Sequence, residues 1–261
     1  MNGSHRSSHR RLAALVAVAG VAAVLAAAVG PARAALQTAS GSAARVVLGA
    51  DNDNADNTFI QPAGVAAKQH MENTDLLLGS PYGDLLVGRK GSDVMDGGYG
   101  ADVLVGGPDK GTPNSDVIFG GYGGDINIWA PGDGDDAFVG GPGYDVHINS
   151  PVALTADGEL ATFRQYGREL PHALIDKQAT SCSVEAVPAQ QGLGFDYITR
   201  FLGANGNVIV TIRLKNVELL VCNSAQPGMA RFAVLRGPAP QLVERPVSRF
   251  AGTLLGAILG A

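Results

Sequence analysis

An aspartate recurs about every nine residues between Leu76 and Ile148, after a short turn and before a mainly apolar triplet. Six units are nine residues long, at 79–87, 88–96, 97–105, 120–128, 131–139 and 140–148. The unit at 106–119 carries five extra residues, and the unit at 70–78 has no glycine. A unit this short cannot bury its own apolar face. About eight repeats in series therefore predict a solenoid in which each unit packs on the next.

The residue types within each unit suit calcium. Glycine allows positive φ and close approach of backbone carbonyls, and aspartate adds a hard carboxylate oxygen. Stacked turns would place these oxygens in rows, which suits Ca²⁺ because it takes roughly six to eight oxygen ligands. Asp75 is the weakest candidate ligand. The stronger ones are Asp84, Asp93, Asp102, Asp116, Asp125, Asp136 and Asp145, with Gly97, Gly98, Gly100, Gly120, Gly121, Gly123, Gly140, Gly141 and Gly143.

The pattern Gly-Gly-x-Gly-x-Asp-x-apolar-x resembles the repeats-in-toxin (RTX) family over residues 70–148. That resemblance implies a parallel β-roll with Ca²⁺ between successive turns. Two turns depart from the pattern, because Tyr82 stands where a glycine is expected and Arg89 replaces the second glycine. The simpler alternative is that Gly and Asp only form turns in a loop-rich β-protein, but this does not explain the nine-residue spacing.

Acidity is confined to the repeats. Residues 75–148 contain twelve aspartates, no glutamate and three basic residues, a net charge of −9, while 35–74 and 149–261 together are neutral. Without a counter-ion such a stack repels itself, so we expect folding to depend on Ca²⁺. Nucleic acid is not an expected partner for this surface.

The N-terminus reads as an export signal. Basic residues lead into the apolar run Leu12–Val29, and Ala32-Arg33-Ala34 forms a cleavage site. We therefore expect a signal peptide at 1–34, a secreted or cell-surface protein, and membrane contact only through that transient segment. An uncleaved membrane anchor is the alternative. Residues 35–69 are expected to be a lead-in or cap of the roll.

An all-β fold is expected overall, with a small antiparallel β-unit at 149–224 packed against the end of the roll. Its expected strands are Leu160–Phe163, Ala173–Asp176, Cys182–Val187, Phe195–Leu202, Asn207–Leu214 and Val217–Cys222. In an exported chain the pair Cys182 and Cys222 favours a disulfide over a two-cysteine metal site. Residues 225–261 read as a Pro/Arg-rich, poorly ordered linker ending in an apolar tail that docks on the roll or frays.

Several triplets are apolar on both sides of the strand, as in Val103 and Val105. Strands of this kind are usually covered on both faces. We therefore expect the C-terminal unit or a partner to mask the outer face of the roll. The alternative is that valine and isoleucine only reflect β-propensity.

Enzyme signatures are absent from the sequence: it has no H-E-x-x-H, G-x-S-x-G or G-x-x-x-x-G-K-[ST] motif. We expect a calcium-binding structural or binding module that is not an enzyme, with calcium ions and a cell-surface glycan or protein as candidate partners. The alternative is a secreted enzyme acting on a polysaccharide or other polymer. Its carboxylates could come from Glu159, Glu169, Asp176 and Glu185. His147 could serve acid–base chemistry, although a structural variant of an apolar position is the simpler interpretation.

Overall fold

The computed structural model describes residues 46–48, 75–89, 91–107, 115–129, 134–175, 181–191, 194–203 and 205–261. The expected signal peptide at 1–34 and nearly all of the lead-in at 35–69 lie outside these residues. Within the described ranges, no helix is long and apolar enough to cross a membrane.

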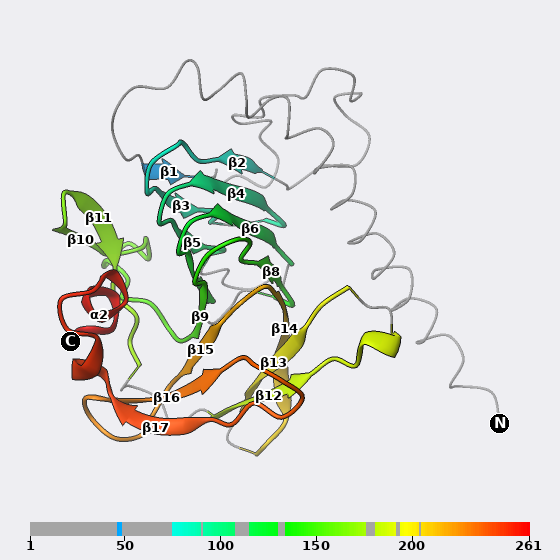
Figure 1. Ribbon diagram of the computed structural model, residues 1–261. Helices are drawn as coiled ribbons and strands as arrows, with labels where there is room; N and C mark the ends of the chain where they lie inside the picture. Colours follow the sequence, from blue (N-terminus) through cyan, green and yellow to red (C-terminus); the bar gives the residue numbers. More distant parts are fainter. Residues whose placement is uncertain are drawn as a thin grey trace, which may run out of the picture.

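Two parallel sheets form the expected roll (Figure 1). Consecutive strands alternate between the sheets, so two repeats complete one coil and each strand pairs with the strand two positions later. One sheet contains β1 (Val46–Leu48), β3 (Leu85–Val87), β5 (Val103–Val105), β7 (Ile126–Trp129) and β9 (Val146–Asn149). The other contains β2 (Leu76–Leu78), β4 (Val94–Tyr99), β6 (Val117–Tyr122) and β8 (Ala137–Val139). The solenoid predicted from the nine-residue period, and the parallel β-roll that the resemblance to RTX repeats implies, are confirmed.

The central residue of each triplet points into the roll. This core includes the fully buried side chains Leu86, Met95, Leu104, Ile118 and Phe138. The flanking residues of the β3–β5–β7–β9 sheet are buried as well, because residues 150–175 and the C-terminal helix cover its outer face. The expected masking of this face by the C-terminal part of the chain is confirmed. The outer face of the β2–β4–β6–β8 sheet is covered less completely, since Val117, Phe119 and Val139 are only half-buried.

The antiparallel unit continues the two sheets of the roll. Its strands are β12 (Ser181–Ala186), β13 (Tyr197–Leu202), β14 (Val208–Lys215), β15 (Leu219–Cys222), β16 (Met229–Val234) and β17 (Val243–Pro246). Strand β14 pairs in parallel with β8, and β15 pairs in parallel with β9. The β14–turn–β15 segment is thus one further coil of the roll, built without the glycine-rich repeat.

Two elements differ from the sequence-based expectation. The prediction of a poorly ordered linker is wrong, because β16 pairs with β15 and β17 pairs with β16, which orders this segment. The expected strand Ala173–Asp176 is also wrong: Ala173 makes only an isolated bridge to Val152, and its N–H donates to Ile258 of the C-terminal helix. A hairpin of β10 (Thr162–Gln165) and β11 (Arg168–Pro171) precedes it.

The C-terminal tail docks. A 3₁₀ turn, η2 (Val247–Phe250), leads into α2 (Leu254–Leu259), which Thr253 caps by accepting a hydrogen bond from the N–H of Gly256. Leu255, Ile258 and Leu259 are buried against the outer face of the roll. Docking, one of the two outcomes expected for this tail, is the one observed.

The predicted disulfide is present between Cys182 and Cys222, with the two Cα atoms 6.2 Å apart. It joins β12 in one sheet to β15 in the other, so it ties the two sheets together at the end of the roll. Both cysteines are buried. The rival prediction of a two-cysteine metal site is excluded by this bond.

Candidate calcium-binding edges of the roll

The turns of the roll lie along two edges. The turns 79–84, 97–102, 120–125 and 140–145 form the first edge, and the described ends of the turns before β4, β6 and β8, at Asp93, Asp116 and Asp136, form the second edge. Each turn follows a strand of one sheet and precedes a strand of the other, so the repeat places equivalent residues directly above one another.

A ladder of aspartates runs along the first edge. The backbone N–H of Asp84 donates to Oδ1 of Asp102 (2.7 Å), that of Asp102 to Asp125 (2.8 Å), and that of Asp125 to Asp145 (2.8 Å). The ladder ends at Glu218, whose Oε2 accepts from the N–H of Asp145 (2.7 Å). All four aspartates are fully buried. A stack of buried carboxylates one coil apart requires positive charge or protons to be stable.

The second edge repeats this arrangement. The N–H of Asp75 donates to Oδ1 of Asp93 (2.9 Å), that of Asp93 to Asp116 (2.7 Å), and that of Asp116 to Asp136 (2.9 Å). Asp75 is half-buried at the start of the ladder, whereas the other three are buried. Residue 90 and residues 108–114 and 130–133, which precede these aspartates in the sequence, lie outside the described residues.

The second carboxylate oxygen marks the candidate ion positions. Oδ2 of Asp102 and Oδ2 of Asp145 are buried and have no hydrogen-bond partner among the described residues. Burial raises the pKa of Asp102 to about 8 and the pKa of Asp145 to about 7, opposed by the backbone N–H that each Oδ1 accepts. A buried carboxylate oxygen with no donor is costly, and a cation beside it would remove that cost.

The first glycine of each turn keeps the space beside this oxygen open. A Cβ added to Gly97 would lie 2.5 Å from Oδ2 of Asp102 and 2.5 Å from the carbonyl oxygen of Gly120, one coil further. A Cβ on Gly120 would lie 2.5 Å from Oδ2 of Asp125 and 2.7 Å from the carbonyl oxygen of Gly140. Carboxylate and carbonyl oxygens therefore converge on the same small volume.

The remaining predicted glycines are needed for backbone shape or close approach. Gly98, Gly100, Gly121, Gly123 and Gly141 all have positive φ, between 104° and 138°. At the last turn, a Cβ on Gly140 would lie 2.5 Å from Oδ2 of Asp145, and a Cβ on Gly143 would overlap the carbonyl oxygen of Gly123. At position 89, where the second glycine is missing, an arginine adopts a positive φ of 74°.

These hard oxygen donors fit Ca²⁺ better than a softer metal. Among the residues that the structure describes, no group of three or more His, Cys, Asp or Glu side chains could hold a metal by itself. Backbone carbonyls would have to complete any coordination shell, as expected for a site built from glycine-rich turns. The candidate ligands are the predicted aspartates and the carbonyls of the glycines beside them.

Arg168 adds a fixed positive charge to the first edge. From β11 its guanidinium donates to the carbonyl oxygens of Ala101 and of Asp84, the latter at 2.5 Å. Burial lowers the pKa of Arg168, and the carboxylates of Asp102, Asp84 and Asp125 oppose that shift. The positive charge of Arg168 therefore interacts with the part of the ladder formed by Asp84, Asp102 and Asp125. The sequence analysis did not single out Arg168, because this contact spans 84 residues.

Glu218 was also missed. Its segment has no glycine-rich turn, so the nine-residue pattern does not reach it. Asn216, with φ 49°, provides the turn where the repeats use glycine. A carboxylate two positions after this turn was the only available signal in the sequence.

His147 is a structural part of the core. It is fully buried, its Nδ1 lies 2.6 Å from Oδ1 of Asn127, and its Nε2 lies 2.8 Å from Oδ1 of Asn149. Asn149 in turn donates to the hydroxyl of Thr199 (2.8 Å). Burial lowers the pKa of His147 to about 4, so the ring is neutral at physiological pH. Asn127 and His147, the two polar residues at central triplet positions, thus form a hydrogen bond with each other.

The carboxylates named for the alternative enzymatic function have structural partners. Glu159 pairs with Arg89 (2.9 Å), Glu185 pairs with Arg200 (2.6 Å), and Glu169 accepts from the hydroxyl of Thr162 (3.0 Å). Asp176 lies outside the described residues.

Comparison with known proteins supports the interpretation of the turns. Residues 78–113 match the family model described as RTX calcium-binding nonapeptide repeat, in four copies. No curated protein and no solved structure matches the chain.

Proposed function

Because residues 78–113 are RTX calcium-binding nonapeptide repeats, we propose that the chain is an exported protein acting as a structural or binding module outside the cell or at its surface. Calcium would fold and stiffen the roll. The mature protein would then present its surface to a cell-surface glycan or protein.

The observation that carries this proposal is the pair of buried aspartate ladders. Oδ2 of Asp102 and of Asp145 has no donor among the described residues, and the glycines beside these atoms leave space that a side chain would fill. Calcium ions between successive turns would neutralise the ladders and bridge one coil to the next. The metal would therefore contribute to folding free energy and not to chemistry.

A non-enzymatic role is part of the proposal. The candidate carboxylates Glu159, Glu169 and Glu185 are held in surface contacts, and His147 is enclosed by Asn127 and Asn149. No observation on the described residues favours the alternative of a polymer-degrading enzyme.

Export is supported by the sequence and by the repeats. The segment 1–34 has the basic, apolar and A-x-A parts of a secretory signal, and RTX repeat proteins are typically exported. The disulfide between Cys182 and Cys222 suits an oxidising compartment. Extracellular calcium sites commonly work with Kd of roughly 10⁻⁴–10⁻³ M, which an exported protein can use.

A calcium titration of residues 35–261, followed by circular dichroism and thermal unfolding, tests the proposal. We expect a cooperative gain of β-signal and of Tm with Ca²⁺ and none with Mg²⁺. An unchanged signal in both Ca²⁺ and chelator would mean that the roll is a self-sufficient β-solenoid, and the proposed function would be wrong.

A further inference from the structure

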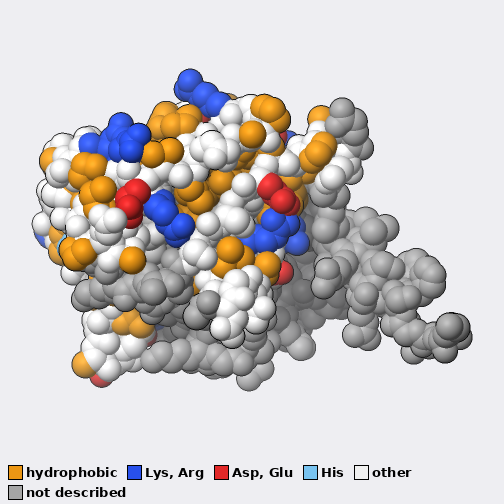
Figure 2. All heavy atoms as spheres, turned by 90° about the horizontal axis from the view of Figure 1, so that it is seen from below, with side chains coloured by type: hydrophobic (Ala, Val, Ile, Leu, Met, Phe, Trp, Pro, Cys, Tyr) orange, Lys and Arg blue, Asp and Glu red, His pale blue; other side chains and the backbone are white. Residues whose placement is uncertain are grey.

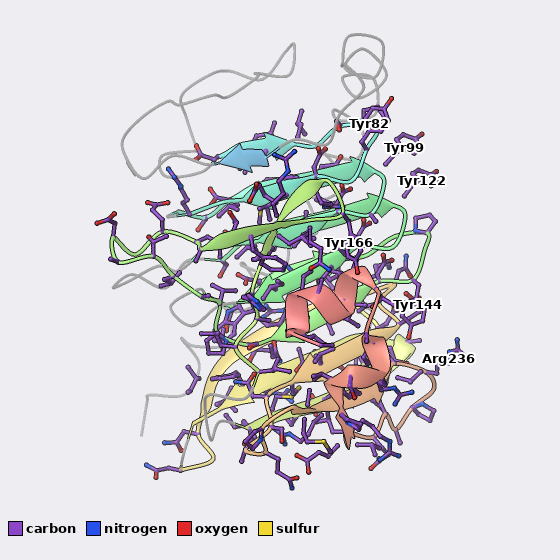
Figure 3. All side chains as sticks on the ribbon, turned by 90° about the vertical axis from the view of Figure 1, so that its left-hand side faces the viewer. Tyr82, Tyr99, Tyr122, Tyr144, Tyr166 and Arg236 are labelled. Atoms are coloured by element: carbon purple, nitrogen blue, oxygen red, sulfur yellow. A yellow bond between two sulfur atoms is a disulfide. The ribbon has the colours of Figure 1, made fainter. Side chains whose placement is uncertain are left out.

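Four exposed tyrosines lie along the first edge of the roll, one in each turn. They are Tyr82, Tyr99, Tyr122 and Tyr144, which we call the tyrosine row; their exposed fractions are 43%, 41%, 52% and 52%. Figure 3 shows the four side chains along the same edge of the roll, projecting away from the strands. Single exposed apolar side chains are common, but several gathered on one edge are typical of an interaction surface.

The geometry of the row follows from the coil repeat. Tyr99 and Tyr122 are paired residues of β4 and β6, and their rings stack with centroids 5.0 Å apart and planes 10° apart. Strands in neighbouring coils lie about 4.8 Å apart, so the roll sets this spacing. The exposed Pro142 occupies the same place in its turn as Tyr99 and Tyr122 in theirs. The edge therefore presents a narrow apolar strip that runs along the axis of the roll.

The charge of the edge restricts the partner. Apart from the tyrosines, its four turns contain only Gly, Ala, Ser, Pro and the ladder aspartates. The aspartates are fully buried, so the strip itself is neutral and lies over negative charge. These turns contain no basic residue, and Arg168, which lies beside them, is engaged with the carbonyl oxygens of Ala101 and Asp84 and with the ladder carboxylates. By contrast, Figure 2 shows basic and acidic side chains interspersed with apolar ones over the end of the molecule formed by the antiparallel unit.

We propose that the tyrosine row is a binding surface for an extended, neutral polysaccharide, and that calcium controls it through the turns. Tyrosine combines an apolar ring with a hydroxyl group. Because the rings of Tyr99 and Tyr122 stack on each other, they offer a polymer their edges and hydroxyl groups, which match the C–H groups and hydroxyls of a sugar. The 5.0 Å spacing of the Tyr99 and Tyr122 rings is roughly the length of one sugar unit, and a narrow strip along the axis of the roll fits a linear polymer better than a globular partner. This inference deepens the proposed function and rests on it, since Tyr99 is only three residues from Asp102 in the same turn.

Retention on insoluble cellulose and chitin, measured with the full exported chain in Ca²⁺ and in chelator, tests the inference. Polygalacturonate, an acidic polymer, is the charge control. We expect retention on a neutral polysaccharide in Ca²⁺, about tenfold weaker retention after Tyr99→Ala with Tyr122→Ala, and little loss after the matching Phe substitutions, which keep the rings.

A matched control uses exposed apolar residues away from the row. Val208 and Ile209 are 54% and 60% exposed, at the opposite end of β14 from the turn at Asn216. Substituting both with alanine should leave retention unchanged. Equal loss in this variant would show non-specific apolar adsorption and overturn the inference.

Other outcomes separate this inference from the proposed function. Calcium-dependent folding without retention on either neutral polymer would overturn the tyrosine row as a glycan site while the proposed function stands. Retention that persists in chelator with no calcium-dependent folding would overturn the calcium control and the proposed function. A change of oligomeric state on removing Tyr99 and Tyr122 would assign the row to contacts between copies of the chain and would also overturn the inference.

Discussion

Gly120→Ala should close one candidate calcium position without requiring alanine to adopt a left-handed φ. Gly120 does not adopt left-handed φ, so alanine is compatible with its backbone. The new Cβ would nevertheless lie 2.5 Å from Oδ2 of Asp125 and 2.7 Å from the carbonyl oxygen of Gly140. The methyl group would therefore occupy the volume on which these two oxygens converge.

Gly120→Ala should change the free energy of unfolding in two ways, which differ in their dependence on calcium. Overpacking should cost about 1–3 kcal/mol at any calcium concentration. Loss of one ion should also reduce the calcium dependence of the unfolding free energy. Above the Kd, each bound ion adds about 1.4 kcal/mol for every tenfold increase in free calcium. The variant should gain about 1.4 kcal/mol less per tenfold increase than the parent protein.

Urea unfolding at a series of free calcium concentrations, at constant ionic strength, measures both effects. Gly124→Ala is the control in the same turn, because its Cβ would meet only the carbonyl oxygen of Tyr144, at 3.2 Å. The control should keep the parent's calcium dependence. The same calcium dependence in the Gly120→Ala variant as in the parent would refute the assignment of an ion to this position.

Three further predictions concern charge and covalent structure. Since burial raises the pKa of Asp102 to about 8 and of Asp145 to about 7, above their unfolded values near 4, the calcium-free protein should lose stability as pH rises from about 4 to 8. Calcium binding in that range should release protons, seen as buffer-dependent heats in calorimetry; no proton release would contradict the raised pKa values. Arg168→Gln should raise calcium affinity on the first edge severalfold, because a cation beside the ladder repels Ca²⁺; a purely structural arginine would give unchanged or weaker affinity in the same titration. Reducing the bond between Cys182 and Cys222, forty residues apart, should cost about 4 kcal/mol of unfolding free energy in calcium, whereas equal urea midpoints with and without reductant would show that the bond contributes little.

The repeats made the roll predictable because each short unit carries its own turn and strand signals. Glycine-rich turns and the fixed apolar slot specify the backbone locally, so the packing of one repeat on the next could be predicted from the sequence. Leu104 and Phe138, which occupy that slot, are buried in the core of the roll. The same locality explains why the aspartate ladder was expected: stacking any two coils brings Asp102 above Asp125.

Contacts between distant segments were not predictable in this way. Arg168 reaches the first edge only because residues 150–175 fold back over the outer face of the roll. Glu218 extends the ladder from a coil that has none of the glycine pattern. The strands β16 and β17 were mistaken for a linker because proline and arginine content suggested disorder. Pairing of β16 with β15, and of β17 with β16, supplies the hydrogen bonds that order them.

The central claim is that the aspartate ladders bind calcium, and equilibrium dialysis of residues 35–261 against Ca²⁺ in excess Mg²⁺ tests it most directly. Two ladders with several coil-to-coil gaps predict more than one Ca²⁺ per chain, with fewer ions bound after Asp102→Asn or Asp125→Asn. A chain that holds no Ca²⁺ above the buffer concentration would contradict the account.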